Sequence, residues 1–219
     1  MSTGVLMKIK WLGHSSFLIT ASSGFKIITD PYLPDSGVRH GEIKETANVV
    51  TISHEHTDHN NALAVGGSPV VLRKSTEVKS ISFHTLAVFH DNVGGRKRGS
   101  NTVFCFTVDG ISICHMGDLG NVPEDRQIRD LGKVDVLLVP VGGFFTLELA
   151  DVNRTIDMIK PRVVIPMHYK TDKIGLPISG VDRFLEGKQN ISRLNVSEVE
   201  LQADTLPAVT TIMVLKPAL

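Results

Sequence analysis

The segment Ser53-His-Glu-His-Thr-Asp-His59 decides how the rest of this chain is interpreted. It follows an apolar run directly and contains three of the chain's nine histidines. Side chains alternate between the faces of a strand, so His54 and His56 are expected to converge on one metal ion, and Asp58 and His59 to reach a second ion from the following turn. Imidazole nitrogens and carboxylate oxygens suit zinc, iron or manganese. A solvated polar loop is the alternative, but four such groups in close succession favour a metal site.

Short runs of strand-forming residues fill the first half of the chain and are separated by Gly, Pro, Asp and Ser. The runs cover 8–11, 16–20, 26–29, 49–52 and 70–72. They predict a sheet that is mostly antiparallel.

Helices and strands alternate in the second half. Apolar residues recur with helical spacing from Leu149 to Ile159, and weaker helical patterns follow Pro123 and the candidate N-cap Ser179. The runs 134–139 and 162–165 are apolar almost throughout, which is typical of strands covered on both faces. The expected fold class is therefore α+β, with sheets layered between helices.

Composition limits the classes of protein to which the chain can belong. With 219 residues, 42% of them hydrophobic and 21% charged, it fits one soluble domain over 1–219, in which residues 1–6 are interpreted as a dispensable tail before a second start at Met7. Its 23 basic and 23 acidic side chains cancel, and Arg96-Lys97-Arg98 is the one basic cluster, so no nucleic-acid partner is expected. The sequence has no apolar run of about 18 residues and no secretory signal pattern, which predicts a cytoplasmic protein without a membrane partner.

The two cysteines are expected to face each other across a hairpin. The runs Thr102–Val108 and Ile111–His115 flank Asp109-Gly110, a strong two-residue turn signal. In that register Cys105 lies opposite Cys114. A redox pair is one interpretation, but two small buried apolar side chains are favoured in a reducing compartment.

The motif at residues 54–59, His-Glu-His-Thr-Asp-His, resembles the HxHxDH signature of the metallo-β-lactamase superfamily. Further segments that carry the resemblance occur in order: Trp11-Leu-Gly-His-Ser15, Thr29-Asp-Pro31, His115-Met-Gly-Asp118, Pro140-Val-Gly-Gly143 and Pro166-Met-His-Tyr169. Together they resemble a small subgroup related to L-ascorbate-6-phosphate lactonase and similar metal-dependent hydrolases. The resemblance implies a single-domain, four-layer αββα sandwich with its metal site at an edge where strand ends meet.

The resemblance also implies that one ion is held by His54, His56 and a third histidine from the middle of the chain. His90 is chosen because it ends the alternating stretch 85–89, as a strand-end ligand should. His84 begins that stretch and is interpreted as a surface or edge residue.

For the second ion, the resemblance implies Asp58, His59 and His168 as ligands, with Asp118 bridging the pair. Asp118 and His168 each follow a predicted strand. Taken alone, an Asp in that position is usually a turn former, so both assignments depend on the histidine cluster. The expected cofactors are two divalent metal ions, Zn²⁺ first, with Mn²⁺ or Fe²⁺ as alternatives.

Four residues near the motifs have supporting or open roles. Asp30 is the candidate acceptor for the second ring N–H of a metal-bound histidine. His14 and His115 are predicted to line the pocket or to donate a proton to the leaving group, with plain packing as the alternative. His40, in a polar stretch, is expected to be exposed.

Aromatic and basic residues are expected near the same edge. Phe144-Phe145 would form a wall of the pocket, and we hypothesise that Arg96, Arg98 or Lys170 holds an anionic group of the substrate. A solvated loop is the alternative for the basic run.

The expected activity is that of a binuclear metal-dependent hydrolase in which a metal-bridging hydroxide attacks a small-molecule ester, lactone or phosphoester. Asp58, Asp118 and His115 are the candidate catalytic residues. The sequence has no Gly-x-Ser-x-Gly elbow and no P-loop. The alternatives are a metal-binding protein of the same fold without catalysis and an iron-dependent oxygenase. A homo-oligomer is expected from the resemblance alone.

Overall fold

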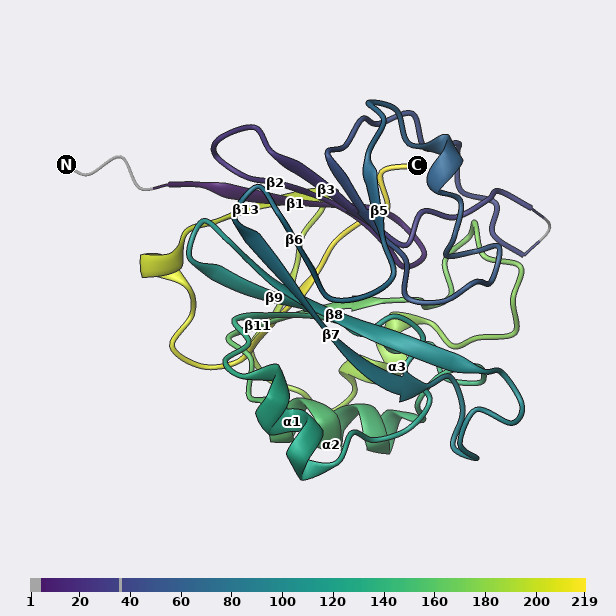
Figure 1. Cartoon of the computed structure of the whole chain (residues 1–219). Helices are drawn as coiled ribbons and strands as arrows, with labels where there is room; N and C mark the ends of the chain where they lie inside the picture. The colour runs from purple at the N-terminus through teal and green to yellow at the C-terminus, as the bar shows by residue number, and fades with distance from the viewer. Residues whose placement is uncertain (1–4, 36) are drawn as a thin grey trace.

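Two β-sheets face each other in the computed structural model, which describes residues 5–35 and 37–219 (Figure 1). The six-stranded sheet has the order β13 (Glu198–Leu201), β1 (Met7–Gly13), β2 (Ser16–Thr20), β3 (Lys26–Thr29), β4 (Val49–Thr51), β5 (Val70–Leu72). The eight-stranded sheet has the order β12 (Ile191–Arg193), β14 (Thr211–Val214), β11 (Val163–Met167), β10 (Val136–Pro140), β9 (Ile111–His115), β8 (Ser100–Val108), β7 (Ile81–Phe89), β6 (Thr76–Val78).

The main core lies between the two sheets, and strand alternation explains its composition. On β1, Met7, Ile9 and Trp11 point into this core, whereas Lys8 and Lys10 are half-buried on the other face. Burying one large apolar side chain contributes about 1.5–3 kcal/mol, so the alternation fixes which face of the strand turns inward.

The opposite face of the six-stranded sheet is also covered. Leu18, Ile28 and Val50 point away from the main core and pack in a second cluster with Tyr32 and Val38, which come from the chain after β3. The cover on this side is irregular chain with one short 3₁₀ helix (Ala62–Ala64). The predicted fold class is confirmed as a mixed two-sheet sandwich with few helices.

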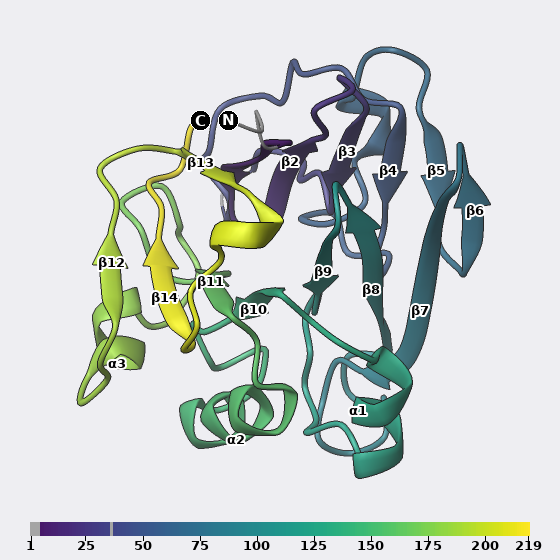
Figure 2. The same ribbon diagram turned by 90° about the vertical axis from the view of Figure 1, so that its left-hand side faces the viewer.

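The helices cover the outer face of the eight-stranded sheet (Figures 1 and 2). They are α1 (Asp125–Leu131), α2 (Leu149–Ile159) and α3 (Val181–Leu185). The helix predicted over 149–159 is confirmed, and the weaker patterns correspond to α1 and α3, although the N-cap of α3 is Gly180 and not Ser179. No helix in the described part of the chain is long and apolar enough to cross a membrane.

Strand directions determine where the functional residues meet. β1 and β2, and β2 and β3, pair antiparallel as predicted, but β3, β4 and β5 pair in parallel. The expectation of a mostly antiparallel first half is wrong there, because the long segment 30–48 returns the chain to the same end of the sheet. β1, β3 and β4 therefore run in one direction, and in the second sheet β7, β9, β10 and β11 also share a direction.

The hairpin around Asp109-Gly110 is confirmed. Both residues have positive φ, 50° and 77°, as a two-residue turn of this type requires. Cys105 is paired with Cys114 in the predicted register, and both are buried free thiols.

Candidate metal centre

The predicted ligands all follow strands that end at one edge of the sandwich. His54, His56, Asp58 and His59 follow β4, His90 follows β7, Asp118 follows β9 and His168 follows β11. The shared strand directions bring these ends together, and the structure gathers all seven side chains. Their role as ligands stays a prediction.

The first group consists of His54, His56 and His90, whose candidate ligand atoms lie within 4.8 Å of one another. Nε2 of His54 lies 3.1 Å from Nδ1 of His56, so the two nitrogens converge. Burial, together with the neighbouring His59, lowers the pKa of His54 to about 3. The imidazole is therefore neutral near pH 7, which is the form that binds a metal ion.

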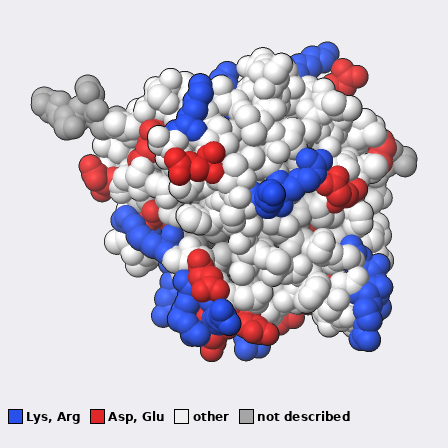
Figure 3. All heavy atoms as spheres, viewed as in Figure 1, with Lys and Arg blue, Asp and Glu red and all other residues white. Residues whose placement is uncertain are grey.

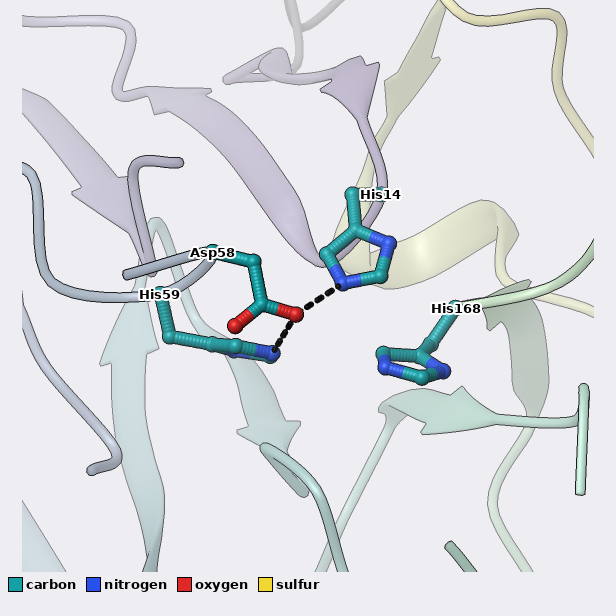
Figure 4. Close-up of side chains that lie close together, drawn as sticks. All are labelled: His14, Asp58, His59 and His168. Atoms are coloured by element: carbon teal, nitrogen blue, oxygen red, sulfur yellow. Dashed lines mark hydrogen bonds and ion pairs between the residues drawn. The ribbon is translucent and has the colours of Figure 1, made fainter. Parts of the chain in front are cut away.

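The second group consists of His14, Asp58, His59 and His168 (Figure 4). Oδ2 of Asp58 lies 3.0 Å from Nε2 of His14 and 3.6 Å from Nε2 of His59. The rings of His14 and His168 are 4.2 Å apart between centroids. Sequence reasoning did not place His14 in this group, although the strand-end argument that selected His90 applies equally to a histidine directly after β1.

Asp118 lies between the two groups. Its Oδ2 is 3.2 Å from Nε2 of His90 and also 3.2 Å from Nε2 of His168, while its Oδ1 is 3.3 Å from Nε2 of His59. One carboxylate thus contacts an imidazole of the first group and two of the second. This is the position that a bridging ligand requires.

Two observations indicate that these residues are suited to binding cations. Nε2 of His59 and Oδ1 of Asp118 are buried and, although 3.3 Å apart, form no hydrogen bond with each other or with another group of the described residues, so each retains a free site for a ligand. Burial opposes charge on His59, but the carboxylates of Asp118 and Asp58 outweigh it and raise its pKa well above the ordinary value. The local potential therefore favours positive charge, and the imidazole and carboxylate donors suit divalent transition metals.

Asp30 lies against the second ring nitrogen of a candidate metal-binding histidine, as predicted. Its Oδ2 lies 2.8 Å from Nδ1 of His59 and accepts a hydrogen bond from Oγ of Ser53 at 2.5 Å. The Ser53 hydroxyl in turn lies 2.9 Å from Nδ1 of His54. With both Nδ1 atoms donating, the Nε2 lone pairs of His54 and His59 remain available toward the site.

The backbone around Asp118 is fixed by a residue that sequence reasoning missed. Asn101, 1% exposed, accepts a hydrogen bond from the Asp118 N–H at 3.0 Å and donates to the Met116 carbonyl at 2.8 Å. Gly120 permits close packing here, because a Cβ on it would lie 2.3 Å from the backbone of His90 and Asp91. A buried Asn within a strand carries no signal in the sequence alone.

The backbone is strained at three residues of the site. His14, Asp30 and His168 all have positive φ, at 50°, 37° and 50°. Such conformations cost on the order of 1–3 kcal/mol each for non-glycine residues and persist where the surrounding packing enforces them.

The sequence also predicted the positions of His115, His40 and His84, and the structure agrees with only some of these predictions. His115 is fully buried, with Nε2 2.8 Å from the Ser15 carbonyl and Nδ1 accepting from the Gly117 N–H, so it does not face the pocket as a proton donor would. His40 was expected to be exposed, which is wrong: it is 2% exposed because the C-terminal segment covers it, and its Nδ1 lies 2.9 Å from the Leu219 carbonyl. His84 is exposed on β7, as expected.

A cavity of about 440 Å³ opens over the cluster, a size suited to a small molecule. It is lined by Glu55, His56, Thr57, Asp58, His90, Arg98, Asp118, Phe145, His168 and Leu176. Of the three candidate anion-binding residues, only Arg98 borders it. Arg96 is exposed, and the Lys170 ammonium donates to the Leu176 carbonyl at 2.9 Å.

Comparison with known proteins identifies the family of this chain. The sequence profile of the Beta-lactamase superfamily domain matches residues 8–168. A UPF0173 metal-dependent hydrolase of Carboxydothermus hydrogenoformans is 31% identical over 196 residues, which cover 75% of this chain and 85% of the relative. A similar protein of Archaeoglobus fulgidus is 29% identical over 204 residues, covering 75% and 84% of the two chains.

Solved structures with the same fold include a candidate Zn-dependent hydrolase of the metallo-β-lactamase superfamily from Thermotoga maritima. It has a TM-score of 0.80 and 34% identity, and the match covers 95% of this chain and 98% of that one. The metallo-hydrolase Igni18 of Ignicoccus hospitalis, at 19% identity and a TM-score of 0.67, shares the fold over 97% and 96% of the two chains. The chain therefore belongs to the metallo-β-lactamase superfamily, within the UPF0173 family of metal-dependent hydrolases.

Proposed function

We propose that this metal-dependent hydrolase cleaves an ester, lactone or phosphoester bond in a small molecule and uses two divalent metal ions. The observation that carries the proposal is the contact of one carboxylate, Asp118, with imidazoles of both histidine groups at 3.2–3.3 Å. A single ion would need only one of these groups.

In this proposal the first ion would be held by His54, His56 and His90. The second ion would be held by Asp58, His59 and His168, and Asp118 would serve as a ligand to both. Ions held in this way supply Lewis acidity and lower the pKa of water toward neutrality, so no nucleophilic side chain is required.

The side chains around the ligands orient them and define the pocket. The imidazole of His14, with Nε2 3.0 Å from Asp58 Oδ2, holds that carboxylate in one orientation. Asp30 and Ser53 fix the ring orientations of His59 and His54. Phe145 and Leu176 line the cavity and exclude water from a bound substrate.

The proposal also includes the identity of the metal, the kind of substrate, the location in the cell and the oligomeric state. Zn²⁺ is the first choice, with Mn²⁺ or Fe²⁺ as alternatives, because nitrogen and oxygen donors accept all three. A substrate like that of the ascorbate-6-phosphate lactonases rests on the sequence motifs. A cytoplasmic location rests on the sequence pattern, and a homo-oligomer on the family resemblance.

The test is turnover by alanine variants of the carboxylates. Purified protein loaded with Zn²⁺ or Mn²⁺ is assayed on lactones, phosphodiesters, thioesters and β-lactams. Asp58→Ala and Asp118→Ala should lose at least about a thousandfold in kcat/KM on the active substrate class while retaining the wild-type circular dichroism spectrum. His84→Ala, on the exposed face of β7, is the matched control and should retain full activity. Full activity in either carboxylate variant would rule out the two-metal mechanism.

A further inference from the structure

The loop between β7 and β8 is held in one conformation by a single buried carboxylate. Asp91, 3% exposed, accepts hydrogen bonds from the N–H groups of Val93, Gly95, Lys97 and Arg98 at 2.8–2.9 Å. Because Asp91 directly follows the predicted ligand His90, the loop is anchored beside the metal centre. The loop backbone therefore holds its three basic residues, Arg96, Lys97 and Arg98, in fixed positions.

Only one of these three side chains turns toward the metal centre. Basic side chains gather over this loop at the lower right of Figure 3. Arg96 and Lys97 are exposed, whereas Arg98 is half-buried. The Arg98 guanidinium lies 5.3 Å from the ring centroid of Phe145, and its Nη2 donates to the Phe144 carbonyl at 3.4 Å. The aromatic ring and the carbonyl hold the guanidinium at the wall of the pocket.

Arg98 stands between two cavities. One is the cavity of about 440 Å³ over the metal centre, and the other, of about 340 Å³, adjoins it beside His54 and His56. The second cavity also contains Arg73, whose charge is neutralised by Glu55 at 2.6 Å. Within residues 5–35 and 37–219, Arg98 forms no ion pair, so it presents an uncompensated charge to both cavities.

We propose that Arg98 binds an anionic group of the substrate, a carboxylate or a phosphate, at the wall of the pocket beside Phe145. The inference rests on the proposed hydrolase function and adds a substrate class to it. The apolar part of the substrate lies against Phe145 and Leu176, and the bond that is cleaved lies near Asp118. A guanidinium is suited to this role because its planar N–H groups match an oxyanion in geometry and charge.

The first test compares two esters that have the same scissile bond and the same chain length. Mono-(4-nitrophenyl) glutarate ends in a carboxylate, and 4-nitrophenyl valerate ends in a methyl group. Arg98→Met keeps an unbranched side chain beside Phe145 but removes the charge, so it should raise KM for the glutarate ester by about tenfold or more and leave KM for the valerate ester within about twofold. Arg98→Lys should restore part of the difference, because the charge returns without the planar fork.

Arg96→Met is the matched control, since it removes the same charge from the same loop at an exposed position. It should change neither KM. Equal effects of Arg98→Met on both esters, no effect on either, or an equal effect of Arg96→Met would overturn the proposal for Arg98 while leaving the hydrolase function intact.

Calorimetry separates failure of the inference from failure of the hydrolase function. If the metal-loaded wild type cleaves neither ester, ester hydrolysis is wrong, and binding of glutarate and of inorganic phosphate decides the role of Arg98. An affinity about tenfold lower in Arg98→Met than in Arg96→Met supports the anion site, and the anion that shows this loss identifies carboxylate or phosphate as its ligand. Equal affinities for both anions in the two variants would overturn it.

Discussion

Nδ1 of His59 lies 2.8 Å from a carboxylate oxygen of Asp30, and both side chains are fully buried. Asp30 comes from the end of β3 and His59 from the segment after β4, two strands that pair in parallel. The contact fixes the ring of His59 so that its Nε2 points toward Asp118.

Asp30→Asn should weaken metal binding by about 10–100-fold, the usual cost of losing such an orienting partner. Asp30 accepts from the Ser53 N–H with Oδ1 and lies against His59 and the Ser53 hydroxyl with Oδ2, whereas asparagine has a single acceptor oxygen, so either the Ser53 N–H or His59 loses its acceptor. Asparagine tolerates the positive φ of 37° at this position, which separates the electrostatic effect from backbone strain. Competition with a chromogenic chelator measures the affinity, and wild-type affinity in the variant would show that Asp30 does not orient His59.

Asn101→Leu should lower the free energy of unfolding by about 3 kcal/mol, because the Asp118 N–H and the Met116 carbonyl lose their buried partner. Asn153→Leu, on helix α2 away from the site, loses a contact with Lys188 and should cost less than about 1 kcal/mol. Urea unfolding monitored by circular dichroism compares the two variants. A cost for Asn101→Leu no larger than that for the control would contradict the role assigned to Asn101.

Gly120→Ala should destabilise the protein by about 3 kcal/mol and reduce metal content, since the added Cβ would lie 2.3 Å from backbone atoms of Asp91 and His90. Backbone cannot rotate away as a side chain can, so the two loops must separate. Gly94→Ala is the control, because its Cβ would meet nothing within 4 Å and only its φ of +70° is unfavourable, at about 1 kcal/mol. Thermal unfolding and metal analysis of both variants test the prediction, which fails if the two behave alike.

The Lys10–Glu45 ion pair, 2.9 Å long, joins β1 to the chain that covers the six-stranded sheet. Burial opposes the charge of Glu45, but its contact with Lys10 outweighs this and lowers the pKa of Glu45 below the ordinary 4.5. A carboxyl whose pKa falls on folding stabilises the protein above its unfolded pKa, and this contribution is lost as pH falls through its folded pKa.

Glu45→Gln should therefore cost up to about 1 kcal/mol at pH 7, and its difference from wild type should shrink as pH falls below about 4.5. Glu42→Gln removes a partner of an exposed, 3.6 Å pair and should cost nothing measurable at any pH. Urea unfolding at several pH values provides the measurement. A difference for Glu45→Gln that grows toward low pH would contradict the sign of the shift.

Residue patterns predicted most of the fold because burial repeats along each element. The strand-forming run 8–11, which lies within β1, and the helical spacing from Leu149 to Ile159 both match the structure. The parallel pairing of β3, β4 and β5 was not predicted, since it depends on the path of the segment 30–48 and not on local periodicity.

The candidate ligands were predicted from the cluster at residues 54–59 and from the family resemblance, and the structure places each of them after a strand. His40 could not be assigned correctly, because its burial depends on contact with Leu219, at the far end of the chain. The hydrogen bonds of His115 and Asn101 likewise join residues that are distant in sequence, at Ser15 and Asp118. Contacts of this kind become visible only in three dimensions.

Elemental mass spectrometry of the untagged, purified protein counts the metal ions that each chain binds. The arrangement of the two histidine groups around Asp118 predicts close to two divalent ions per chain in the wild type, and about one ion or fewer in His90→Ala and in Asp118→Ala. A wild type that binds no divalent ion, even after incubation with Zn²⁺ or Mn²⁺ and removal of the excess, would contradict the two-metal site.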